Sequence, residues 1–529
     1  MRYNNIPGQV KPLQPLDVYT WGAYAQDEFQ VSKDLKVTGG LRIDVPSFGN
    51  TGFDNANADA LTFVDENGNP VHYNSAKLPS AQVLLSPRLG FNYDVFGDRT
   101  TQVRGGTGIF TGKPAYVWIS NQIGNTGVLT GFLQVTDTSA LKNYHFNPNP
   151  DAYKPTNVTG APASTYELAL TDPNYKFPQQ WRSDIAVDQQ LPFGFTGTAE
   201  FIYGREINGE YYINANQSAP NTAFNGPDNR PRWTVTNRIN ANVQDATVIK
   251  NENTGYNWSV AASIERPLLQ GIYGKLGYNY AVAKNTVDPG SIAFGSWSAN
   301  QVPGNANNSP LGYSQTSPGS RVFASVSYTS NGGTTLSLFW DMYTFGNGSY
   351  TVSGDMNGDG NSSNDLIYIP RNTSEMNFVQ NTQSGVTVTP AQQRAAWDTY
   401  IAQDPYLSTH RGQYAERNAA FLPMVSRLDM SIIQAIKWET LEKPQTIELR
   451  LDILNVGNLF DRKIGQGSHF VNLQPLIVPT TAEGGVANAL GQPQYKMRVV
   501  NGSLMSHSYE YNATLADVYS FQFGIKYFF

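Results

Sequence analysis

One short segment has the residue types and spacing of a cation site. In DMNGDGNSSNDLIYIP, residues 355–370, side-chain oxygens recur at the first, third, fifth, seventh and eleventh positions. Calcium prefers such oxygen ligands, and a glycine at the sixth position of a calcium loop supplies its sharp turn. The pattern predicts calcium binding, as the only cofactor, by Asp355, Asn357, Asp359, Asn361 and Asp365.

The same segment has a simpler interpretation. Its twelfth position, which is acidic in helix-flanked calcium loops, is Leu366, and no helices are predicted on either side. Asn, Asp and Gly also favour turns because they tolerate left-handed backbone conformations. A loop turn without metal is therefore the alternative to calcium.

No other residues form a catalytic motif. The five histidines are scattered, and none has the HExxH spacing of a zinc site. RGGTG, residues 104–108, lies within a strand pattern rather than at a strand-to-helix turn, so it predicts no phosphate site. The absence of cysteine excludes disulfides and thiolate metal sites. We predict no catalytic residues and no enzyme activity.

Aromatic residues in predicted loops could stack on a sugar or peptide, or could belong to a loop core or an interfacial girdle. They are Tyr211, Tyr212, Trp233, Trp297, Tyr313 and Tyr350. TPAQQRAAWDTYIAQDP predicts a short helix beginning after Thr389, because Thr followed by Pro is a typical helix start. That helix could be a binding lid or a packing element within its loop.

These residues must be positioned by β-structure. Apolar and polar residues alternate with period two along many segments, as in the terminal YSFQFGIKYFF, where every second residue is aromatic or Ile. Thirteen strands are predicted, starting near residues 18, 36, 84, 99, 181, 194, 256, 271, 319, 333, 423, 445 and 516. Arginines and aspartates on the polar faces predict charge ladders. These residues are Arg42, Arg88, Arg104, Arg182, Arg427 and Arg450 with Asp44, Asp184, Asp429 and Asp452.

Short and long connections alternate between these strands. The long ones lie near residues 46–83, 111–180, 205–255, 284–318, 344–422 and 457–515. Compact soluble domains rarely contain such loops, whereas outer-membrane barrels have short periplasmic turns and long extracellular loops. We predict an all-β, antiparallel transmembrane barrel in contact with outer-membrane lipid. A soluble extracellular β-protein is the alternative.

Charge and hydropathy exclude other classes. The formal net charge of −6 offers no basic surface for nucleic acid. The sequence contains no run of about 18 apolar residues, so no transmembrane helix is predicted. The start of the chain does not resemble a signal peptide.

Several stretches resemble TonB-dependent outer-membrane receptors: WGAYAQDEFQVSKDLKVTGGLRID, LSPRLGFNYDVFGDRTTQVRGGTGIF, LRLDILNVGNLFDRK and the final strand. RGGTGIFTGKPAYVWISNQIGNTG, FPQQWRSDIAVDQQLPFG and DMNGDGNSSNDLIYIP resemble the Oar-like branch, common in Bacteroidetes-type bacteria. The resemblance covers nearly the whole chain. It implies a Gram-negative outer-membrane location, a barrel of about 22 strands, a plug domain and TonB-driven uptake of an unidentified solute.

The chain departs from that pattern because no TonB box, plug or first barrel strands are recognisable. We expect residues 1–17 to end an extracellular loop and residues 18–529 to form strands and loops, with partner subunits or missing segments completing the barrel. TonB would act through the missing plug. Alternatively, segments near 115–122, 209–216, 242–250 and 495–501 add strands that close a smaller barrel. The alternative function is a surface adhesion or assembly barrel that binds protein or polysaccharide without transport.

Overall fold

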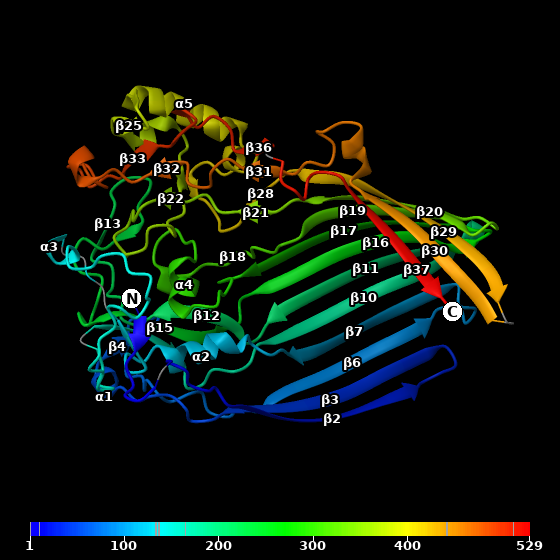
Figure 1. The fold of residues 1–529 in the computed structure, drawn as a ribbon, viewed down its shortest axis with the longest axis horizontal. Coiled ribbons are helices and arrows are strands. Elements are labelled where there is room, and N and C mark those ends of the chain that lie inside the picture. The colour runs from blue at the N-terminus through cyan, green and yellow to red at the C-terminus, as the bar shows by residue number, and fades with distance from the viewer. Residues whose placement is uncertain are drawn as a thin grey trace.

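The computed structural model describes residues 2–9, 11–132, 135, 138–163, 165–440, 443–511 and 513–529. Within them, thirteen long strands form one antiparallel series in a large curved sheet, in sequence order (Figure 1). They are β2 (Val18–Gln30), β3 (Leu35–Phe48), β6 (Leu84–Asp94), β7 (Thr101–Thr111), β10 (Gln179–Leu191), β11 (Phe195–Glu206), β16 (Tyr256–Leu269), β17 (Ile272–Asn285), β19 (Gly319–Thr329), β20 (Thr334–Thr344), β29 (Met424–Thr440), β30 (Lys443–Leu454) and β37 (Ser520–Phe528). The thirteen predicted strands are all present.

The two faces of this sheet differ in polarity because side chains alternate along each strand. Val260, Leu449 and Phe523 lie on the apolar face and are 44%, 42% and 78% exposed. A soluble sandwich would bury such a face, whereas a membrane barrel turns it toward lipid. The exposure of the apolar face therefore agrees with the predicted membrane fold.

Short turns and long connections lie at opposite ends of the sheet (Figure 1). Between β16 and β17 the turn residues Gln270 and Gly271 both have positive φ, 52° and 79°. Two consecutive positive φ angles characterise the type I′ hairpin turn, whose twist suits paired strands. The predicted short link between β29 and β30 includes residues 441–442, which lie outside the described residues.

The described sheet is open, because β2 and β37 pair with no further strand on their outer sides. The predicted alternative of a smaller closed barrel is wrong. Residues 116–124 form a helix, and the other three candidate segments contribute strands to separate small sheets. Residues 209–216 and 242–250 are mainly buried along their length rather than on alternate residues, so they pack within the loops instead of extending the main sheet.

Among the described residues, five α-helices lie in the connections. They are α1 (Ala56–Asp59), α2 (Tyr116–Gly124), α3 (Thr138–Leu141), α4 (Ala293–Ser298) and α5 (Pro390–Gln403). In the described part of the chain, no helix is long and apolar enough to cross a membrane.

Apart from β15, which has ten residues, the described strands outside the main series have at most six residues each. They are β1 (Arg2–Asn4), β4 (Phe63–Val64), β5 (Pro70–Val71), β8 (Thr130–Phe132), β9 (Tyr166–Thr171), β12 (Gly209–Asn214), β13 (Thr222–Ala223), β14 (Pro231–Arg232), β15 (Val243–Glu252), β18 (Gly312–Tyr313), β21 (Asn347–Gly348), β22 (Val352–Ser353), β23 (Tyr368–Ile369), β24 (Asn377–Phe378), β25 (Asn381–Gln383), β26 (Val386–Val388), β27 (Gln413–Tyr414), β28 (Ala420–Phe421), β31 (Ser468–Phe470), β32 (Leu476–Ile477), β33 (Gln494–Met497), β34 (Val499–Val500), β35 (Ser503–Leu504) and β36 (Tyr509–Tyr511).

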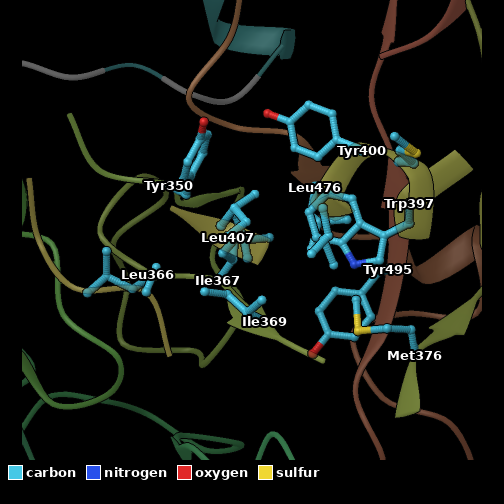
Figure 2. Close-up of a cluster of buried hydrophobic side chains, with 14 of the residues drawn as sticks. Tyr350, Leu366, Ile367, Ile369, Met376, Trp397, Tyr400, Leu407, Leu476 and Tyr495 are labelled. Atoms are coloured by element: carbon cyan, nitrogen blue, oxygen red, sulfur yellow. The ribbon is translucent and has the colours of Figure 1, made fainter. Parts of the chain in front are cut away.

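The described residues of the long connections pack into what we call the loop body, which lies within residues 49–83, 112–178, 207–255, 286–318, 345–423 and 455–519. It contains the described hydrophobic core clusters, apart from Leu84 at the start of β6. Figure 2 shows the largest, in which Trp397 and Tyr400 of α5 stack with their ring centroids 5.4 Å apart. The predicted helix is therefore present, and it is a packing element of the loop body.

Candidate functional site

The predicted cation segment is a turn held by its own carboxylates. Asp355 accepts hydrogen bonds from the main-chain N–H of Gly358 at 2.6 Å and of Gly360 at 2.9 Å. The φ angles of these glycines are 85° and 93°. A Cβ at Gly358 would lie 2.1 Å from the Trp233 carbonyl oxygen, so this position requires glycine. The loop geometry agrees with both the calcium and the simple-turn interpretation.

The middle of the segment is buried and polar. Asp359 accepts hydrogen bonds from the Asn361 N–H at 2.8 Å and from the Asn364 side-chain amide at 2.9 Å. Asn357 accepts one from the Asp359 N–H and donates one to the Gly304 carbonyl. Among the described residues, Asn364 Oδ1 has no hydrogen-bond partner although the residue is completely buried. An unsatisfied oxygen therefore lies beside the Asp359 carboxylate.

Asp365 has a different environment from the other predicted ligands. One carboxylate oxygen accepts from Arg230 at 3.1 Å, and the other accepts from the Met356 N–H at 2.9 Å. Both atoms of the ion pair with Arg230 are inaccessible to solvent. Asp365 therefore bonds the predicted cation segment to Arg230, which lies in the connection 207–255.

The negative charges of the carboxylates in the segment 355–365 are only partly balanced by nearby positive charge and hydrogen bonds. Burial raises the pKa of Asp355, and it raises the pKa of Asp359 to about 6. Burial raises the pKa of Asp365 to about 7, because the Arg230 charge offsets only part of the desolvation and the nearby aspartates oppose ionisation. A bound cation would favour the ionised forms.

The described residues place some limits on a metal shell. No group of three or more His, Asp or Glu side chains among them is arranged to hold a metal ion. A calcium shell would therefore combine Asp355 and Asp359 with amide and main-chain oxygens, which calcium accepts readily. The five-residue calcium site stays a prediction.

A buried charge cluster next to this segment was missed by sequence analysis. Arg230 is completely buried and donates to both oxygens of Asp228, at 2.9 and 3.1 Å. Tyr414 and Tyr495 donate their hydroxyl hydrogens to the same carboxylate, at 2.9 and 2.5 Å. With Asp365, these residues join three connections, 207–255, 345–423 and 455–519.

Within this cluster, the negative charge of Asp228 is balanced by Arg230 and by hydrogen bonds. Burial alone would raise the pKa of Asp228, but the Arg230 charge and the hydrogen bonds to the carboxylate lower it below its usual value. Burial likewise opposes the Arg230 charge, yet Asp228 and Asp365 raise its pKa. Both groups therefore remain charged, and the cluster holds the three connections together.

The aromatic residues considered as ligand contacts lie mainly in the loop core. Tyr212, Trp233, Trp297 and Tyr350 are each at most 4% exposed. Tyr211 and Tyr313 are partly buried. These rings are therefore packing residues, as the alternative interpretation predicted.

The predicted charge ladders are only partly present. Arg42 pairs with Asp44, and Arg450 with Asp452, each at 2.7 Å. The other two arginines with ion pairs have unpredicted partners. Arg104 contacts Asp188 and Glu200, and Arg427 contacts Asp517 from the last connection. The period-two alternation in the sequence predicts which face of the sheet each arginine lies on, but it does not predict which residue of a neighbouring strand or connection the arginine contacts.

Comparisons with known proteins give one family match. A family model described as the outer membrane beta barrel domain matches residues 8–461. No curated protein sequence matches the chain.

Several solved structures are similar to the chain. The outer membrane transporter YddB of Escherichia coli is 11% identical, with a TM-score of 0.43, over 88% of this chain and 52% of that one. The FrpB iron transporter of Neisseria meningitidis is 10% identical, with a TM-score of 0.41, over 98% of this chain and 46% of that one. The ferric enterobactin receptor of Pseudomonas aeruginosa is 9% identical, with a TM-score of 0.39, over 91% and 52%. The chain spans about half the length of these structures.

Proposed function

We propose a function from one premise, which is that the chain belongs to the outer membrane beta barrel domain family. The protein is located in the outer membrane, where the apolar face of its sheet contacts lipid. On this basis we propose that the chain is the barrel portion of an Oar-like receptor. The receptor would capture a solute with its extracellular loops and import it by TonB-dependent transport.

The observation that carries this proposal is the ordered loop body at one end of the sheet. Its connections contain their own hydrophobic core, and the Arg230 cluster ties three of them together. Ordered loops lose less conformational entropy on binding than mobile ones do. The loop body is therefore suited to presenting a fixed binding surface above the barrel.

The open sheet supports a larger assembly. Unpaired main-chain groups along β2 and β37 cannot face lipid without a large energetic cost. We propose that further strands complete the barrel and that a plug domain provides the contact with TonB. Within this proposal residues 1–17 belong to an extracellular connection, and residues 18–529 supply strands and loops.

Calcium is part of the proposal as a structural ion. Asp355, Asn357, Asp359 and Asn361 would supply oxygen ligands, and Asp365 would stay paired with Arg230 or complete the shell. The unpartnered Asn364 oxygen and the raised pKa of Asp359 support this proposal. An ion there would stiffen the connection 345–423 and would take no part in a catalytic step.

The test is growth of a deletion strain in defined media in which one nutrient at a time is limiting. We expect a growth defect on at least one nutrient, rescued by the intact gene in a strain with TonB but not in one without it. Normal growth on every nutrient together with loss of surface assembly would contradict transport and support the adhesion alternative.

A further inference from the structure

A polar cavity lies inside the loop body. Its volume is about 440 Å³, within the range of small-molecule sites. Its walls come from three connections, 286–318, 345–423 and 455–519. Ala299 and Leu473 are the only apolar side chains larger than glycine in its lining, which otherwise presents amides, hydroxyls and two opposite charges. Polar side chains therefore outnumber apolar ones in the lining.

The wall of this cavity is rigid. Arg417 is 4% exposed and donates to Asn300 Oδ1 at 3.0 Å. The neighbouring Asn418 is also buried, and its main-chain N–H donates to the Ser349 hydroxyl at 2.8 Å. The first bond joins two connections, and the second joins residues 69 positions apart within the connection 345–423. The polar groups are consequently fixed before any ligand arrives, which favours specific binding.

The two charged side chains in the lining balance each other. Arg417 lies 3.8 Å from Asp288. The Asp288 carboxylate also accepts four hydrogen bonds, from the side chains of Asn285, Ser314 and Asn418 and from the Gln315 N–H. A carboxylate has about four lone-pair positions. Asp288 thus has no free position for a ligand ammonium group, and the lining carries no net charge.

Two buried polar atoms of the wall remain unsatisfied. Among the described residues, Arg417 Nε and Asn347 Oδ1 have no hydrogen-bond partner. One is a donor and the other an acceptor. Both atoms are closed to solvent, so a ligand in the cavity would bond the amides and hydroxyls of the lining instead, and a hydroxyl group can do so because it both donates and accepts.

We propose that this cavity binds a small uncharged, hydroxyl-rich ligand of the size of a mono- or disaccharide. The inference rests on the proposed function, since it names the class of solute that the loop body would capture. Side-chain amides such as those of Gln315 and Gln474, together with the hydroxyl of Thr351, supply further donors and acceptors. A cationic ligand would find no free carboxylate position in this lining, because Asp288 is already saturated.

The test is calorimetric titration of the full chain, in a detergent without a sugar headgroup, with glucose, galactose, mannose, maltose, cellobiose and sucrose in turn. Ser363 lines the cavity and is exposed, so Ser363→Phe reduces the cavity without disturbing a buried contact. The adjacent Ser362 is exposed and does not line the cavity, so Ser362→Phe is the matched control. We expect saturable binding of at least one sugar, weakened about tenfold or more by Ser363→Phe and unchanged by Ser362→Phe.

Three results would overturn the inference: no saturable binding of any of these sugars, equal binding by Ser363→Phe, or tighter binding of the zwitterionic dipeptide glycylglycine. Transport is measured separately by growth of the deletion strain. Sugar binding without TonB-dependent growth would contradict the proposed transport and leave the cavity assignment standing. TonB-dependent growth without sugar binding would support the proposed transport and contradict the proposed sugar site in the cavity.

Discussion

Arg230 is completely buried, and its charge is balanced by aspartates from two different connections. A charge without a partner is costly in such an environment, whereas a well-bonded pair is tolerated. The two tyrosine hydroxyls complete the bonding of Asp228. At the residue scale, the stability of the loop body therefore depends strongly on one guanidinium group.

Replacing Arg230 with Met should destabilise the loop body by about 3–5 kcal/mol, because it leaves two buried aspartates without their cation. Pulse proteolysis of the detergent-solubilised protein in increasing urea would measure this loss. Arg238→Met, at an exposed site in the same connection, is the control and should change stability little. Equal resistance of both variants would contradict the assigned role of Arg230.

Calcium and pH should act together on the segment 355–365. The pKa values of Asp359 and Asp365 are about 6 and about 7, against an unfolded value of about 3.9. The stability from their protonated forms is complete below about pH 4 and is lost as the pH rises through these folded values.

Calcium should compensate this loss, since it stabilises the ionised carboxylates. We therefore expect millimolar calcium to raise the melting temperature more at about pH 8 than at about pH 5. Differential scanning calorimetry would show this, with Asp359→Asn and magnesium as controls. An increase that is independent of pH, or is retained in the Asn variant, would contradict calcium binding at this segment.

The segment 355–365 is recognisable in the sequence because its ligand-type residues are close together in the chain. Arg230 is not recognisable in this way, because its local sequence has no distinctive spacing and its partner Asp365 is 135 positions away. The polar cavity was missed for the same reason, since its lining residues converge only after three connections have packed.

At the scale of elements, local signals were sufficient for α5. Its Thr389 side chain accepts from the Gln392 N–H, while the Gln392 side chain accepts from the Thr389 N–H. This reciprocal capping box and Pro390 fix the start of the helix. The strands β9, β12 and β15 lack an equally clear signal, because mainly continuous burial replaces the period-two alternation that marks the barrel strands.

Removal of the α5 cap should have a moderate and local effect. Thr389→Ala should cost about 1 kcal/mol, the usual value of a helix N-cap. Amide hydrogen exchange in the first turn of α5 should accelerate, while exchange in β16 and β17 stays unchanged. Faster exchange throughout the sheet would show instead that α5 supports the barrel as a whole.

At the scale of the whole molecule, strand direction shows how the barrel can close. Successive strands are antiparallel, so the first and thirteenth of the series, β2 and β37, run in the same direction (Figure 1). Direct closure would require a parallel pair, whereas bacterial outer-membrane barrels have even numbers of antiparallel strands. An odd number of additional strands between these edges satisfies that rule.

We therefore expect the native species in purified outer membranes to contain barrel strands beyond the 58.2 kDa of this chain, on a longer polypeptide or a bound partner. Intact mass under native and denaturing conditions would distinguish these two sources. Because the chain has no cysteine, Gln26→Cys and Gln522→Cys together place unique thiols on β2 and β37. A short bismaleimide should not join them, since other strands would intervene. Efficient cross-linking within a species of 58.2 kDa would mean that the chain closes on itself, and the proposal of a larger barrel would then fail.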